Sequence, residues 1–267
     1  MIPDRKLSAF ALVTLAVVIL YVSEPLGENF YIVGDTMTIS LSFAAVLSGL
    51  YAYRPHGFGS MQGRALLFLT LGTFFWFLGE FSWGYYEIFL GTETPVASIA
   101  DVFWIIGYPL FLLGLYYIFR VSSNTFSKGR LAVLAVLIAG MSLSMLYLAV
   151  PTLAGAGMSA EEKASTAGYV IGDMLLMSAL MVVISSILGG KLTKPWIIIL
   201  AGLFLSTIAD TYYMNFQAHY ETGNLIDILW NLDYLLMVLG FIYHRETVEG
   251  IIKAASGGKR GSKEAGK

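Results

Sequence analysis

The sequence predicts an all-α integral membrane protein in which eight transmembrane helices form two tandem four-helix repeats. Three observations lead to this fold class. The composition is 57% hydrophobic and only 13% charged, which is typical of a chain whose solvent is lipid. The apolar runs are too long for the strands of a membrane barrel, so the spans are predicted to be helices. The two halves of the sequence also resemble each other along their length.

Each apolar run is long enough to cross a hydrocarbon core of about 30 Å. In chain order the runs are residues 7–23, 36–53, 65–90, 99–119, 131–150, 168–188, 195–216 and 225–243. The first run follows Arg5 and Lys6 as a signal peptide would, but no small-residue cleavage site accompanies it. We therefore expect this run to be retained as the first span.

The charged residues of the connections sort by sign and predict the orientation. One set of connections is basic and holds Arg5, Lys6, Arg54, Arg64, Arg120, Lys128, Arg130, Lys191, Lys194 and the tail from Arg245 onward. The other set is acidic, with Lys163 as its only basic residue. By the positive-inside rule both termini are cytoplasmic in a multi-pass protein of the cell membrane. Residues 251–267, rich in Gly, Ser and Lys, are expected to form a disordered basic cytoplasmic tail.

An internal duplication organises the chain. The segment IADVFWIIGYPLFLLGLYYIFR from Ile99 matches LIDILWNLDYLLMVLGFIYHRE from Leu225. The acids at matching positions are Asp35 with Asp173, Glu80 with Asp210, and Asp101 with Asp227. Because each unit has an even number of spans, residues 1–125 and 126–250 are predicted to be parallel repeats related by a twofold axis along the membrane normal. A central site would lie between them.

Two of these acids are expected deep in the outer half of the membrane. Glu80 and Asp210 fall about fifteen residues into outward-running helices, hence ~23 Å along a ~30 Å path. Charge at this depth is costly, and acids there usually face a partner or a water-filled cavity. Since the basic residues are predicted to lie on the other side, the carboxyls must be protonated, hydrogen-bonded or neutralised by an external cation.

Helix capping is the alternative role for the other acids. Residues 98–101 and 224–227 each read as an N-cap followed by an acid at the third helical position, and Asp35 could cap the second span. For these three acids the sequence favours capping over ligand contact. Asp173 is harder to explain in this way, because it is expected about two turns inside its helix.

Aromatic residues accompany the acids. Each repeat has a polar and aromatic stripe with i, i+3, i+7 spacing, formed by Glu80, Trp83 and Glu87 in the first and by Asp210, Tyr213 and Gln217 in the second. Trp104 and Trp230 lie one turn below the capping acids, where they would suit an organic cation or amine. The neighbouring Trp76, Tyr85, Tyr86, Tyr108, Tyr212 and Tyr234 are predicted mostly to form an interfacial belt.

One difference between the two copies is informative. Where the first repeat has Gly107 the second has Asp233, beside Asn231. This additional acid would serve the movement of protons or cations, or it would make a satisfied interhelical hydrogen bond.

The sequence also argues against several function classes. The net charge of -2 gives no indication of a nucleic-acid partner, and the absence of Cys excludes thiol nucleophiles and Cys-metal sites. The three histidines are scattered, and hydrolase, phosphate-loop and zinc-protease motifs are absent. We therefore expect no catalytic residues and no cofactor other than a bound cation; the identity of any metal stays open.

The segment GEFSWGYYEIFLGTETPVASIADVFWIIGYPLFLLGL resembles the multi-span N-terminal sensory module of bacterial and archaeal signalling proteins, where it precedes histidine-kinase or diguanylate-cyclase domains. The resemblance implies sensing by a membrane-embedded domain. Beyond the last predicted span this sequence has only a short tail in place of an output domain, so a separate cytoplasmic signalling partner is expected.

The leading functional hypothesis is a membrane-embedded receptor that takes a small cationic ligand from the outer face into an acidic and aromatic cavity between the repeats. The first alternative is a small secondary transporter or channel for a cation, proton or amine that uses the same acids. The second alternative is a non-catalytic assembly subunit of a membrane complex.

Overall fold

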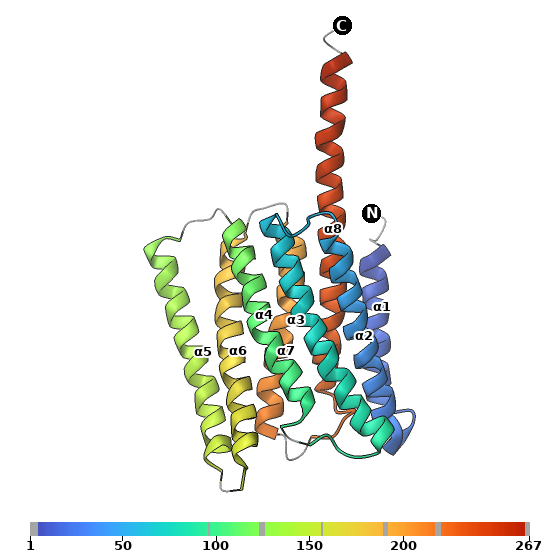
Figure 1. Ribbon diagram of the computed structural model, residues 1–267, viewed down its shortest axis with the longest axis vertical. Coiled ribbons are helices and arrows are strands. Elements are labelled where there is room, and N and C mark those ends of the chain that lie inside the picture. Colours follow the sequence, from blue (N-terminus) through green and yellow to red (C-terminus); the bar gives the residue numbers. More distant parts are fainter. Residues whose placement is uncertain are drawn as a thin grey trace.

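The computed structural model describes residues 5–95, 97–122, 126–155, 157–188, 192–216 and 220–264. This part of the chain is mainly helical, as predicted, and each predicted run falls largely on one long helix, with 65–90 also covering the π-helix that follows (Figure 1). The elements are α1 (Arg5–Ser23), η1 (Gly27–Asn29), α2 (Phe30–Tyr53), α3 (Met61–Gly84), η2 (Tyr85–Leu90), α4 (Ile99–Val121), α5 (Lys128–Ala154), α6 (Ala160–Ser186), α7 (Thr193–Phe216) and α8 (Asp227–Glu264).

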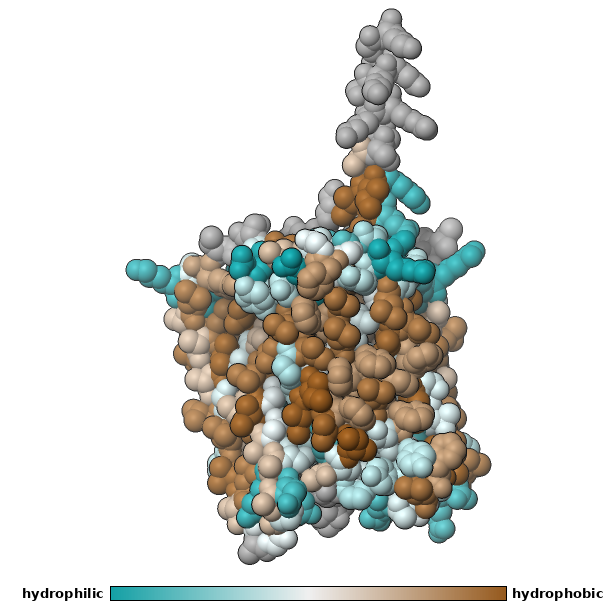
Figure 2. Space-filling model, in the orientation of Figure 1, coloured by the Kyte–Doolittle hydropathy of each residue, from teal (hydrophilic) through white to brown (hydrophobic). Residues whose placement is uncertain are grey.

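Within the described residues, seven helices are long and apolar enough to cross a membrane, namely α1 to α7, with η1 continuing into α2 and α3 into η2. The chain is thus a multi-pass membrane protein. Figure 2 shows the matching surface, a band of hydrophobic side chains between two more polar ends. Helix α8 is not among the seven, since the part of it inside the bundle contains the fully buried Asn231, Asp233 and His244.

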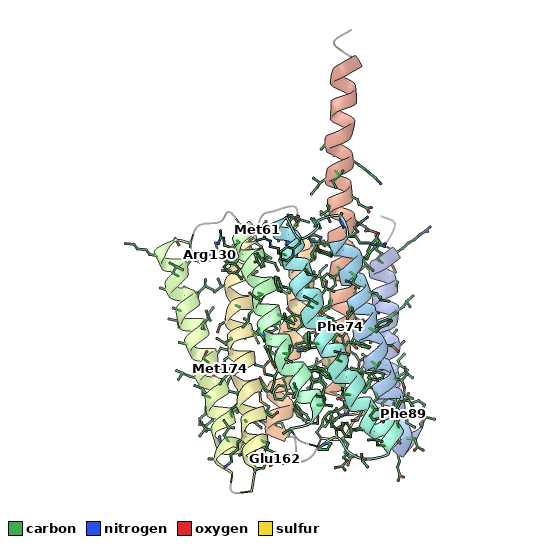
Figure 3. The ribbon with its side chains drawn as sticks, in the orientation of Figure 1. Met61, Phe74, Phe89, Arg130, Glu162 and Met174 are labelled. Atoms are coloured by element: carbon green, nitrogen blue, oxygen red, sulfur yellow. The ribbon has the colours of Figure 1, made fainter. Side chains whose placement is uncertain are left out.

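Successive long helices run antiparallel, so α1 begins and α8 projects at the same end of the bundle (Figure 1). We call this the basic end, because the connections that meet there carry Arg54, Arg64 and Arg130. The opposite end is called the acidic end. Figure 3 shows Arg130 at the basic end and Glu162 at the acidic end. The sorting of charge along the sequence therefore corresponds to two separate ends of the folded molecule.

Six helices form a closed ring. Around it α2 packs against α3, α3 against α4, α4 against α6, α6 against α7, α7 against α8, and α8 against α2. Helix α1 packs outside this ring against α8, and α5 packs outside it against α6 and α7. The ring encloses the main apolar core, with Leu69, Phe111, Leu200 and Phe241 among its fully buried side chains.

The last part of α8 extends beyond the other helices (Figure 1). The segment 251–264, for which composition predicts a disordered tail, continues the helix to Glu264. Disorder of this tail stays a prediction, since a helix without tertiary packing is only marginally stable in water.

Candidate functional site

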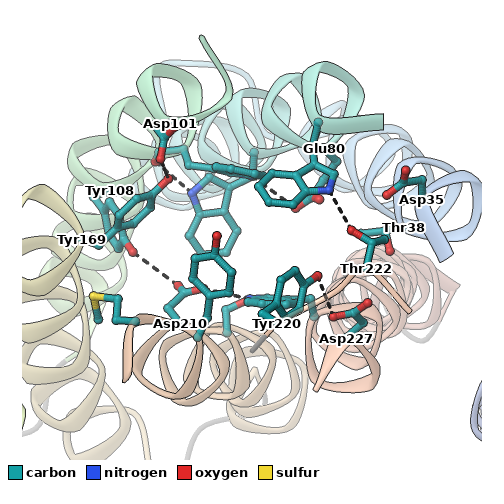
Figure 4. A pocket seen from close by; sticks show the side chains of 17 residues that line it. Asp35, Thr38, Glu80, Asp101, Tyr108, Tyr169, Asp210, Tyr220, Thr222 and Asp227 are labelled. Carbon is teal, nitrogen blue, oxygen red and sulfur yellow. Dashed lines mark hydrogen bonds between the residues drawn. The ribbon is translucent and has the colours of Figure 1, made fainter. Parts of the chain in front are cut away.

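A cavity of about 100 Å³ lies inside the ring towards the acidic end (Figure 4). It is lined by Asp35, Thr38, Trp76, Glu80, Trp83, Asp101, Trp104, Tyr108, Tyr169, Ser206, Asp210, Tyr213, Met214, Tyr220, Thr222, Asp227 and Trp230. At the acidic end, the cavity wall includes the first turns of α4 and α8. Towards the basic end, the wall reaches Ser206, ten residues before the end of α7 at Phe216, or about 15 Å along the helix axis.

Glu80 and Asp210 lie on opposite sides of the cavity (Figure 4), and matched donors hold them. Glu80 Oε1 accepts hydrogen bonds from Trp104 Nε1 at 3.3 Å and from the Tyr234 hydroxyl at 2.7 Å. Asp210 accepts from Trp230 Nε1 at 2.8 Å and lies 3.4 Å from the Tyr108 hydroxyl. In each case the Trp comes from the same half of the chain as the acid and the Tyr from the other half.

Asp101 both caps a helix and lines the cavity. The predicted capping box is present, and the Ser98 backbone N–H donates to Asp101 Oδ2 at 2.7 Å. The other oxygen, Oδ1, accepts from Ser165 Oγ at 3.0 Å and from the Tyr169 hydroxyl at 2.9 Å, both on α6. Capping and pocket lining are therefore compatible, because a carboxylate has lone pairs enough for both.

Asp227 has a similar arrangement at the start of α8. Its Oδ2 accepts from the Gly223 backbone N–H at 2.8 Å, and its Oδ1 accepts from the Tyr220 hydroxyl at 2.9 Å. Asn224, the predicted N-cap, accepts through its side-chain Oδ1 from the Ile226 backbone N–H, in the turn before α8. Burial and the neighbouring Asp227 raise the pKa of the Tyr220 phenol well above its ordinary value, so Tyr220 remains a hydrogen-bond donor.

The prediction that Asp35 caps the second span is wrong, because α2 begins at Phe30 and Asp35 lies more than one turn inside it. Its side chain is 5% exposed and lines the cavity. Among the described residues its Oδ2 has no hydrogen-bond partner.

Glu87 does not extend the predicted stripe into the cavity. The chain changes from α-helix to π-helix at Tyr85, and the wider turn rotates Glu87 away from the line of Glu80 and Trp83. Glu87 instead accepts a hydrogen bond from Thr222 Oγ1 at 3.0 Å. Its counterpart Gln217 lies outside the described residues.

Asp173 and Asp233 are fully buried behind the cavity wall. Asp173 Oδ1 accepts from the Tyr108 hydroxyl at 2.8 Å, and Asp233 Oδ2 accepts from Ser206 Oγ at 2.6 Å. Within the described part of the chain, one oxygen of each acid is without a partner. Helix α6 starts after Ser159, earlier than expected from the sequence, so Asp173 lies about four turns inside it.

Aromatic rings make up much of the wall. The Trp83 and Trp104 rings are 5.8 Å apart beside Glu80, and the Tyr213 and Trp230 rings are 6.1 Å apart beside Asp210. For three residues the interfacial-belt prediction is wrong, because Trp76, Tyr108 and Tyr234 are buried within the bundle. By contrast, Tyr85 and Tyr212 are exposed at 47% and 43%, as a belt would require.

Several lining residues carried no functional prediction. They are Thr38, Tyr169, Ser206, Met214, Tyr220 and Thr222. The repeat held a signal for one of them, because Tyr169 occurs in the YVIGD segment that matches YIVGD in the first half. Tyr220 and Thr222 come from the connection between α7 and α8, where no periodic pattern shows which side chains point inward.

The cavity is strongly acidic. Within the described residues its wall includes the carboxyls of Asp35, Glu80, Asp101, Asp210 and Asp227 and no Lys, Arg or His. The five carboxyls are spread around the wall, and each lies beside a different set of side chains (Figure 4). Clustered acids with adjacent aromatic faces attract organic ammonium groups.

Comparisons with protein-family models, with curated proteins and with solved structures found no match to this chain.

Proposed function

We propose that the protein is a membrane-embedded sensory receptor whose cavity binds a small organic cation. The observation that carries this proposal is the composition of the cavity wall, which has five carboxyls, eight Trp or Tyr residues, and no basic side chain among the described residues. An ammonium ligand would neutralise carboxylate charge that is costly to bury away from water. We propose a receptor because part of the sequence resembles the membrane sensory module of signalling proteins.

The cavity is proposed to lie between two parallel repeats. Matched packing supports this: a Cβ on Gly114 would meet Leu69, and a Cβ on the equivalent Gly240 would meet Ile199. The difference between Gly107 and Asp233 is compensated in volume. Gly107 packs against the large Trp76, whereas Asp233 packs with the small Ser206.

We propose α8 as the eighth span and as the link to the cytoplasm, with the basic end facing inward. The first two turns of this helix carry Asp227 and Trp230 of the cavity wall, and its far part extends past the basic end. A ligand that moves these residues would shift the whole helix, since a helix transmits displacement along its axis. A cytoplasmic partner would then contact this extension or the connection between Arg54 and Arg64.

Binding can be measured by calorimetry on the purified protein in nanodiscs, with primary and quaternary alkylammonium ions as probes. We expect saturable binding that is lost in the double variant Glu80→Gln with Asp210→Asn. Glu161→Gln is the matched control, because Glu161 is an exposed acid at the same end of the bundle but outside the cavity. Equal binding by the double variant and the control would contradict the proposal.

A transporter is the second candidate, favoured by one observation. The buried Asp233, with an unpartnered Oδ1 among the described residues, lies behind Ser206 in the cavity wall and could accept a proton or cation. Against this, fully buried side chains such as Leu66, Leu200 and Phe241 form an apolar layer on the basic side of the cavity. Flux of a bound cation into proteoliposomes, abolished by Asp233→Asn, would favour transport over reception.

A further inference from the structure

The cavity contains two equivalent half-sites. In one, Glu80 lies beside the Trp83 and Trp104 rings; in the other, Asp210 lies beside the Tyr213 and Trp230 rings. The aromatic pairs occupy matching positions of the proposed repeats. Each half-site thus offers a carboxyl and two aromatic rings, the kinds of group that surround an ammonium group in aromatic cages.

From this we infer that the ligand is a linear dication, an alkane with an ammonium group at each end, that binds with one ammonium at Glu80 and the other at Asp210. The inference rests on the proposed function and specifies its ligand class. Figure 4 shows Glu80 and Asp210 on opposite sides of the pocket that both of them line, so a chain between the two carboxyls would cross it.

The hydrogen bonds at the two carboxyls favour this occupancy. Each carboxyl accepts from one Trp N–H, and Glu80 also accepts from the Tyr234 hydroxyl; such donors favour the ionised form of a carboxyl. The donors carry no net positive charge, so two negative charges would remain to be neutralised. A monocation can neutralise only one of the two, whereas a diammonium ion neutralises both.

A third carboxyl indicates that the site is built for cationic groups. Asp35 is 5% exposed, lines the same cavity, and among the described residues leaves its Oδ2 without a hydrogen-bond partner. An N–H donor of a ligand can satisfy a buried acceptor of this kind, which is otherwise costly to leave unpaired. The alkyl chain between the ammonium groups would contact the aromatic rings that line the cavity.

The test compares diaminobutane with butylamine and with aminobutanol, in which one ammonium is replaced by a hydroxyl. Calorimetry on the intact protein in nanodiscs should show that diaminobutane binds about tenfold tighter or more than either monoammonium probe, because the second ammonium adds one further partly desolvated cation–aromatic contact. Diaminopropane and diaminohexane bracket the chain length.

Two single variants test whether the preference for the diammonium probe needs both carboxyls. In Glu80→Gln or in Asp210→Asn the advantage of diaminobutane over butylamine should disappear, while butylamine keeps its affinity for the remaining half-site. Should either variant fail to fold, the probe comparison on the unaltered protein still decides.

Three outcomes are distinguishable. Preference for the diammonium probe supports the inference. Equal affinities for diaminobutane and butylamine overturn the dication but leave the proposed cation receptor intact. Absence of binding by every ammonium probe overturns the proposed function and the inference together.

Discussion

Replacement of Gly240 by Ala should destabilise the protein by up to about 2 kcal/mol. A Cβ at this position on α8 would lie 2.4 Å from Ile199 Cγ1, 3.0 Å from the Ile199 backbone N and 3.1 Å from the Pro195 carbonyl oxygen. Ile199 is fully buried and cannot swing aside, and the two backbone atoms move only with α7. Overpacking of this kind costs about 1–3 kcal/mol, of which the higher helix propensity of Ala returns about 1 kcal/mol.

Gly140→Ala on α5 is the matched control, because a Cβ there meets no atom within 4 Å. It should be neutral or stabilise by up to about 1 kcal/mol. Unfolding in mixed micelles with increasing dodecyl sulfate, followed by tryptophan fluorescence and circular dichroism, measures both variants. If Gly240→Ala proves as stable as Gly140→Ala, the close packing of α7 against α8 is refuted.

Three further predictions concern single side chains. Tyr234→Phe removes the donor at 2.7 Å from Glu80 and should cost about 0.6–1.7 kcal/mol in the same unfolding assay; an unchanged midpoint would exclude this bond. Ser159→Ala removes the α6 N-cap and should cost about 1 kcal/mol, with faster amide exchange confined to the first turn. Burial and Arg245 lower the pKa of His56, so the folded state favours the neutral ring. Stability should then fall as pH drops below about 6.5, and His56→Gln should flatten this dependence in thermal unfolding.

Much of the helical framework could be predicted because lipid imposes simple rules. A span must be long, apolar and helical, so composition alone located α1 to α7 and their approximate ends. Helix starts were less accurate where polar residues lie inside a helix. The first six residues of α2 were missed because Asp35 was interpreted as a possible cap, whereas it is buried inside the helix.

The site could be predicted only in part. Depth and the lack of nearby basic residues identified Glu80 and Asp210, and both line the cavity. Tyr108 and Tyr234 were assigned to the wrong environment, because the local sequence around a tyrosine on a spanning helix does not show whether its side chain faces lipid or the ring interior. Their hydrogen bonds to acids of the opposite half depend on contacts between residues more than a hundred positions apart.

The sequence by itself determined the class of protein, the alternation of basic and acidic connections, and the set of acids that need explanation, because these follow from composition and order along the chain. Only the tertiary structure decided which faces of the helices meet. Closure of six helices into a ring brought five acids and the aromatic rings around one cavity, buried Asp173 and Asp233 behind its wall, and rotated Glu87 out of line through a π-turn. The physical reason is that side-chain direction depends on helix rotation and packing, which local sequence does not specify.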